Sequence, residues 1–179
     1  MNNYEYITAS LPDLAASCPE DLEAVRAKVE EQLSQKDAAL LDLLFRAPEE
    51  SLYREASSSR SRFVREYFDF DRAVRNTKAS FFGAPMLLLD EDEETAQTCG
   101  EALEILKNPD IVEREKQLDS LLDAKAADLS VLEVFSLDGI LSVFARLKTA
   151  HRWASLDPGE GRRRLDNLLK EIRQTYDNR

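Results

Sequence analysis

Apolar residues recur along most of this chain at the spacing of a helix. Seven segments place them three, four and seven positions apart, which is the period of an amphipathic helix with one buried face. These segments lie at residues 22–33, 40–45, 63–74, 96–106, 111–129, 137–150 and 165–176. Only five glycines and six prolines occur in 179 residues, which favours long regular elements. The pattern therefore predicts an all-α fold, a multi-helix bundle of about seven helices.

Helix-start signals support several of these segments. Ser17-Cys18-Pro19-Glu20 and Asp157-Pro158-Gly159-Glu160 each combine an N-cap residue, an early proline and a glutamate three positions later, as in a capping box. Ser34 is a candidate cap for the second segment, and Pro48 should end that helix. The Asn108-Pro109 pair predicts that one helix stops and the next begins.

The segment at residues 63–74 carries the heaviest aromatic load. Phe63, Tyr67, Phe70 and Val74 fall on one helical stripe, and neighbouring apolar residues widen it. Aromatic side chains bury large areas, so this helix is predicted to be the most buried one. Residues 81–85, which read Phe-Phe-Gly-Ala-Pro, should end it.

Two short segments fit a strand as well as a helix. Residues 4–11 alternate aromatic or hydroxyl side chains with Glu5, Ile7, Ala9 and Leu11, which permits a short strand. An extended arm over residues 1–16, lying on a helical core, fits equally well. Residues 86–89 are a second candidate strand or a buried crossing segment. We therefore expect one helical domain over residues 1–179, with this arm packed on it and at most a minor two-stranded element from 4–11 and 86–89.

Charge and composition exclude several classes of protein. The net charge of −11 argues against nucleic acid as the main partner, because phosphate binding needs a basic face. Two cysteines, Cys18 and Cys99, cannot form a disulfide framework and favour a reducing cytoplasm. No apolar run approaches the roughly 18 residues of a membrane span, and the first six residues do not resemble a signal peptide. We expect a cytoplasmic protein without direct membrane insertion, which partner subunits could hold at the inner membrane.

The sequence contains no recognisable catalytic, cofactor-binding or metal-binding motif. His151 is the only histidine, so a zinc site or di-iron bundle built on several histidines is excluded. It lies on an apolar helical stripe beside Trp153, and a packed, half-buried histidine is the favoured interpretation. The phosphate-binding glycine motifs and the serine-nucleophile elbow are missing as well. We therefore expect no cofactor and no enzymatic activity.

Three surface features are candidates for binding a partner protein. They are the acidic run Asp90, Glu91, Asp92, Glu93 and Glu94, the basic cluster Arg162, Arg163 and Arg164, and the two aromatic residues Tyr4 and Tyr6 of the N-terminal arm. Charged runs of this kind dock partners of opposite charge, although any solvated helical surface carries similar residues.

Three segments together resemble a small bacterial family of unknown function. They are Tyr4-Glu5-Tyr6-Ile7-Thr8-Ala9-Ser10-Leu11-Pro12, the aromatic helix from Phe68 to Asn76, and Arg152-Trp153 with Leu156-Asp157 and Gly161. The family is typically encoded among V/A-type ATP synthase subunits and looks distantly similar to the C (or d) subunit, an all-helical protein that couples the central stalk to the rotor ring. The resemblance implies a helical fold and subunits of a V/A-type ATPase as partners.

These observations leave three hypotheses. The first is a non-enzymatic protein-interaction subunit, accessory to a V/A-type proton- or sodium-translocating ATPase, with a stalk or rotor-coupling role. The second is a free-standing cytoplasmic adaptor or regulator with an unrelated partner. The third is an enzyme that uses carboxylates without a known motif, which a pocket holding carboxylates of raised pKa would favour.

Overall fold

The computed structural model describes residues 4–12, 21–87 and 98–177, and the side chains of these residues up to 170. Nine helices form in these ranges: α1 (Glu5–Ser10), α2 (Leu22–Glu30), α3 (Gln35–Leu43), α4 (Glu50–Ser57), α5 (Arg62–Phe81), α6 (Gly100–Leu106), α7 (Ile111–Ser130), α8 (Leu137–Ala154) and α9 (Pro158–Asp177). The described residues contain no strand. The prediction of an all-α fold is confirmed, with α1 and α4 added to the seven expected helices.

The prediction of a strand or extended arm at residues 4–11 is wrong. Tyr4, the residue before α1, and Ile7 within it are three positions apart, and both are buried in the main core. The Tyr4 N–H donates to the carbonyl of Phe135 at 3.0 Å, and its own carbonyl accepts from the Thr8 N–H at 2.9 Å. This local helical bonding and the burial of both side chains outweigh a weak alternation of β-forming residues.

The second candidate strand is not formed in the part that the structure describes. Met86 and Leu87 are irregular, and residues 88 and 89 lie outside the described ranges. Asn76 of α5 is fully buried, and its side-chain amide forms hydrogen bonds with both backbone groups of Leu87. The Leu87 N–H donates to Asn76 Oδ1 at 2.7 Å, and Asn76 Nδ2 donates to the Leu87 carbonyl at 3.1 Å. Asn76 thus satisfies this backbone in the way that a neighbouring strand would.

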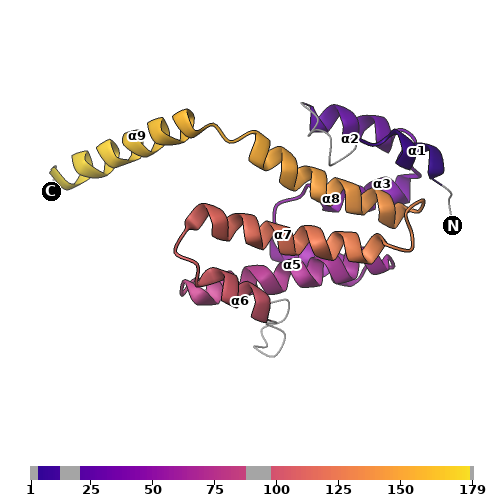
Figure 1. Cartoon of the computed structure of the whole chain (residues 1–179), viewed down its shortest axis with the longest axis horizontal. Helices are drawn as coiled ribbons and strands as arrows, with labels where there is room; N and C mark the ends of the chain where they lie inside the picture. Colours follow the sequence, from indigo (N-terminus) through magenta and orange to yellow (C-terminus); the bar gives the residue numbers. More distant parts are fainter. Residues whose placement is uncertain (1–3, 13–20, 88–97, 178–179) are drawn as a thin grey trace.

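Three long helices form the centre of the molecule (Figure 1). α7 packs against both α5 and α8, α4 packs on α5, and α6 lies against α5 and α7. α1, α2 and α3 contact α8 from its other side. The main core joins large side chains of these layers, among them Leu41, Phe63, Phe144 and Leu147. Full burial of each such side chain contributes on the order of 1.5–3 kcal/mol to the stability of the fold.

The start and end signals of the helices are mostly where the sequence places them. Ser34 caps α3 by accepting from the Asp37 N–H, as predicted. The Asn108-Pro109 pair predicts Asn108 as the N-cap of the helix that follows. Asp110 is the N-cap of α7 instead and accepts from two backbone N–H groups, so the helix begins two residues after the predicted cap would start it. α5 ends at Phe81, and Gly83 follows with a φ of +68°, a conformation that glycine adopts without strain. The predicted cap at residues 17–20 lies outside the described residues, and α2 is capped by Asp21.

α5 is the most buried of the described helices, as the aromatic stripe predicts. Nine of its 20 residues are buried, including the polar Asp71, Arg72, Asn76 and Thr77. On the same helix, Arg62 pairs with Glu66 at 2.6 Å. The buried polar residues were not anticipated from the apolar stripe.

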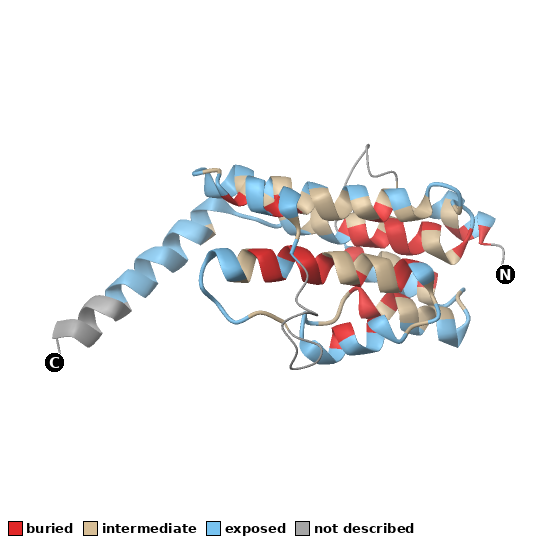
Figure 2. Ribbon diagram, turned by 90° about the horizontal axis from the view of Figure 1, so that it is seen from below, coloured by how far each residue is buried: buried red, intermediate tan, exposed pale blue. Residues whose placement is uncertain are grey.

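α9 extends away from the packed helices at one end of the molecule (Figure 1). Its start agrees with the prediction, because Asp157 Oδ1 accepts from the Gly159 N–H at 2.7 Å. Every residue from 161 to 170 is exposed, so this stretch of the helix is pale blue throughout in Figure 2. The other long helices show a buried face toward their neighbours.

Candidate functional site

The structure separates the two predicted tyrosines of the N-terminal segment. Tyr4 is only 7% exposed, and its hydroxyl donates to the carboxylate of Asp37. Tyr6 is 80% exposed and remains a candidate contact residue. Tyr4 therefore anchors α1 to the other packed helices and is not available to a partner. The packed helices α1 to α8 are called the body of the molecule below.

The two predicted charge clusters have different outcomes. The acidic run at residues 90–94 lies outside the described residues, as does Cys18. Arg162, Arg163 and Arg164 lie exposed in the first turns of α9. Glu160 pairs with Arg164 at 2.8 Å and also contacts Arg163. The basic cluster therefore belongs to the helix that extends from the body.

α9 carries an apolar face that nothing in the described chain covers. Leu165, Leu168 and Leu169 are 54%, 53% and 44% exposed, although they fall on one face at positions 0, 3 and 4 of the helical period. In a packed helix such a face is buried against a neighbour. This face is therefore available for a surface outside the described chain.

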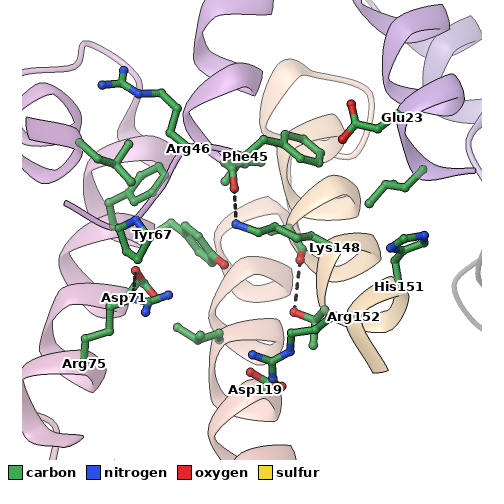
Figure 3. A pocket seen from close by; sticks show the side chains of 18 of the residues that line it. Glu23, Phe45, Arg46, Tyr67, Asp71, Arg75, Asp119, Lys148, His151 and Arg152 are labelled. Carbon is green, nitrogen blue, oxygen red and sulfur yellow. Dashed lines mark hydrogen bonds and ion pairs between the residues drawn. The ribbon is translucent and has the colours of Figure 1, made fainter. Parts of the chain in front are cut away.

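A second candidate site is a cleft of about 670 Å³ lined by α5, α7 and α8, the end of α3 and the start of α2 (Figure 3). Its volume lies in the range of small-molecule pockets. Apolar side chains line one part of it, including Leu44, Phe45 and Leu122, and charged or hydroxyl groups from several helices line the rest.

One wall of the cleft is a buried network on α4 and α5. The Tyr53 hydroxyl donates to Asp71 Oδ2 at 2.5 Å, and Arg75 Nε donates to the same oxygen at 2.8 Å. Tyr53 and Asp71 are buried, whereas the Arg75 side chain is partly exposed. Burial and the neighbouring carboxylate of Asp71 raise the pKa of Tyr53 far above its usual range, so this hydroxyl remains a donor.

The facing wall is a polar cluster on α7 and α8. Asp119 accepts from Trp153 Nε1 at 2.7 Å and also pairs with the guanidinium of Arg152. Asp123 lies one turn further along α7, and burial raises its pKa to about 6 against the lowering effects of a hydrogen bond from Thr149 and the charge of Arg146. Asp119 lines the cleft, whereas Asp123 is not among the residues that line it.

Lys148 and Tyr67 point toward each other from opposite walls of the cleft (Figure 3). Lys148 Nζ donates to the carbonyl of Leu44 at 2.5 Å, at the C-terminal end of α3. Burial lowers the pKa of Lys148, and the nearby charges of Arg75 and Arg152 lower it further, while Asp71 opposes them. Burial also raises the pKa of Tyr67 well above its usual range.

The histidine and the cysteine of the described chain are both half-buried. His151 is half-buried at the edge of the cleft, as the interpretation of its stripe predicts. Cys99 has a free thiol and packs against a small core formed by α5, α6 and α7. Its backbone N–H donates to Thr77 Oγ1 at 2.7 Å. In the described residues, no three histidine, cysteine or carboxylate side chains gather in a way that could hold a metal ion.

The cleft could not be identified from the sequence, because its polar residues come from separate helices. Asp71, Asp119 and Lys148 each read as an ordinary charged position beside an apolar stripe. The one available signal was the placement of Asp71 between Phe70 and Ala73, on the aromatic face of the helix predicted to be most buried. An acid on such a face requires a buried partner.

Comparison with known proteins gives one match. A family model described as "Protein of unknown function (DUF2764)" matches residues 91–175, just under half of the chain, from before α6 to near the end of α9. No curated protein and no solved structure matches the chain. The likeness to a family of unknown function is thus supported over this region, while a link to V/A-type ATPases stays a prediction. Among the described helices, none is both long and apolar enough to cross a membrane.

Proposed function

We propose that this protein is a non-enzymatic interaction subunit that docks onto a V/A-type ion-translocating ATPase through α9, in a stalk or rotor-coupling role. The observation that carries the proposal is the exposed leucine face of α9, a 20-residue helix that extends from the body. Most helices in proteins gain their stability by packing an amphipathic face. A partner that covers Leu165, Leu168 and Leu169 would supply that packing.

The charges of α9 indicate what kind of surface it fits. The helix holds five basic and four acidic residues, a net charge of +1, so the rest of the chain carries −12. Helical periodicity places Arg162 and Arg164 at the two edges of the leucine face and Arg163 on the opposite side. We infer a partner with an apolar groove and an acidic rim, because opposite charges at the edges orient a docked helix.

A protein groove fits these features better than a lipid surface. Helices that lie on membranes carry a strongly basic polar face and large aromatic anchors. The polar side of α9 instead mixes bases with Glu160 and Asp166, and no Trp or Phe occurs between residues 158 and 177. The choice of a V/A-type ATPase as the partner rests on the resemblance of residues 4–12, 68–76 and 152–161, and the family match overlaps the last of these segments.

The test is affinity purification of the tagged full-length chain from gently solubilised native membranes. Leu168→Asp places a charge in the leucine face, and Asn167→Asp places the same charge on the opposite side of the same helix. We expect stalk or rotor subunits to be recovered near stoichiometrically with the wild-type chain and with Asn167→Asp. Recovery should fall at least tenfold with Leu168→Asp.

Three results would contradict the proposal. Equal recovery with both variants would show that α9 is not the docking element. Recovery of an unrelated protein in place of ATPase subunits would support a free-standing adaptor. A concentration-dependent dimer in light scattering, abolished by Leu168→Asp, would show that a second copy covers the leucine face.

A further inference from the structure

We propose that the cleft between α3, α5, α7 and α8 binds a small organic anion, with a carboxylate or phosphate head at Lys148 and Tyr67 and an apolar body against Leu44, Phe45 and Leu122. This site is separate from α9, and the inference does not depend on the proposed docking role.

The first argument is the hydrogen-bonding state of Lys148. Its neighbours Arg75 and Arg152 are each paired with a carboxylate, Asp71 and Asp119 respectively. In the described part of the chain, Lys148 has no carboxylate within ion-pair distance, and its one bond goes to a backbone carbonyl. An ammonium has three donors, so two remain available, and Lys148 reaches solvent through the cleft.

The second argument is Tyr67, a hydroxyl donor on the facing wall. Its ring packs between Phe63 and Phe68, at centroid distances of 5.6 Å to each, which fixes its direction. The structure records no hydrogen bond for its hydroxyl within the ranges that it describes. Figure 3 shows this hydroxyl and the Lys148 amine directed toward the same space. Two fixed donors that meet in a cleft define a position for an acceptor group.

The third argument concerns the charge of the head group. Lys148 lies in the field of Arg75 and Arg152 as well as of Asp71. The lysine and arginine residues that line the cleft are Arg46, Arg75, Arg152 and Lys148. The three arginines pair with Glu55, Asp71 and Asp119, so Lys148 alone among these four has no carboxylate partner in the described chain, although Asp21 and Glu23 also line the cleft. A carboxylate or a phosphate monoester matches this ammonium, whereas the larger negative charge of a polyphosphate would be repelled by Asp71 and Asp119.

The fourth argument is the remaining volume. About 670 Å³ far exceeds the space that a carboxylate or an inorganic phosphate fills. Leu44, Phe45 and Leu122 line the space, and such surfaces gain from covering an apolar group. The ligand class is therefore an amphiphilic anion and not an inorganic ion.

The experiment titrates the full chain with octanoate, octyl phosphate, octan-1-ol and inorganic phosphate. Trp153 is the only tryptophan and donates to Asp119 at the cleft, so its fluorescence reports on binding. Amide shifts in proton–nitrogen NMR spectra locate the site. We expect saturable binding of octanoate or octyl phosphate, with shifts on α5, α7 and α8. The alcohol and inorganic phosphate should bind roughly tenfold more weakly or not at all. Comparing the two octyl anions identifies the head group.

Variants then assign the donors. Lys148→Met should weaken binding of the preferred anion about tenfold, Lys148→Arg should restore it, and Tyr67→Phe should weaken it about threefold. Two control variants should leave binding unchanged. One is Lys107→Met, which replaces an exposed lysine paired with Glu104, and the other is Leu168→Asp on α9. The proposal is overturned if neither octyl anion binds saturably, if the alcohol binds as tightly as the anions, if Lys148→Met binds like the wild type, or if Leu168→Asp abolishes binding.

Discussion

α8 and α9 carry nearly the same hydrophobic pattern but lie in opposite environments. In α8, Ile140, Phe144 and Leu147 recur at helical spacing and are completely buried. In α9, Leu165, Leu168 and Leu169 follow the same period and are about half exposed. The difference arises from what lies beside each helix, because α7 and α1 to α3 pack on α8, whereas α9 extends from the end of the body.

This contrast shows what an amphipathic pattern does and does not specify. The period fixes which side of a helix is apolar, but not whether the covering surface belongs to the same chain. For α8 the covering surface is the core of the protein. For α9 we infer that it belongs to a partner, and the following substitutions test this difference between the two helices.

The largest expected effect is on a matched pair of leucines. Leu147→Ala in α8 should lower the free energy of unfolding by about 2–5 kcal/mol, because it leaves a cavity in a fully buried site. Leu168→Ala in α9 should change it by less than about 0.5 kcal/mol. Urea unfolding followed by circular dichroism measures both. A loss above about 1 kcal/mol in the α9 variant would show that its leucine face packs on the body.

The second pair compares polar contacts in the two regions. Asp71→Ala should cost about 2–3 kcal/mol, since it leaves the buried Tyr53 hydroxyl without an acceptor and Arg75 without its partner. Glu160→Ala, which removes the pairing with Arg163 and Arg164 on α9, should cost less than about 1 kcal/mol, as exposed ion pairs do. The same unfolding curves measure both variants. Similar losses of unfolding free energy for Asp71→Ala and Glu160→Ala would show that the polar contacts of α9 stabilise the protein as much as those of the body.

Most of the architecture follows from the sequence, because periodicity and capping are local properties. Ser34 and Asp157 begin helices where they are predicted to, and the aromatic helix is the most buried. The failures have long-range causes. α1 is helical because Tyr4 and Ile7 pack against a core whose other members lie far away in sequence, and the cleft exists because Asp71, Asp119 and Lys148 converge from three helices. Apart from the acid on the aromatic face of the most buried helix, the sequence carries no signal that these residues meet.

A third prediction concerns pH and the body alone. The pKa of Asp123 is raised to about 6 by burial, so the folded state holds this proton more tightly than the unfolded state, where the pKa is near 4. Its contribution to stability is therefore complete below about pH 4 and is lost as the pH rises through 6. Asp123→Asn should stabilise the protein at pH 8 relative to the wild type, and the gain should shrink at pH 4.5. Asp166→Asn on the exposed α9 is the control, and its effect should not vary in this way. Equal effects of Asp123→Asn at both pH values would contradict the raised pKa.

The smallest expected effect on stability is that of removing α9 altogether. A chain that ends after Ser155 should have the same free energy of unfolding in urea as the full chain, within about 0.5 kcal/mol. It should lose only the circular dichroism signal of α9. If the leucine face serves a partner, this chain should no longer recover ATPase subunits, yet it should keep the Trp153 response to the preferred octyl anion. Loss of both activities together with stability would mean that α9 is part of the body. Loss of partner recovery alone would show that the chain carries two independent apolar surfaces. One is buried among α1 to α8, and the other, the leucine face of α9, is buried by another protein.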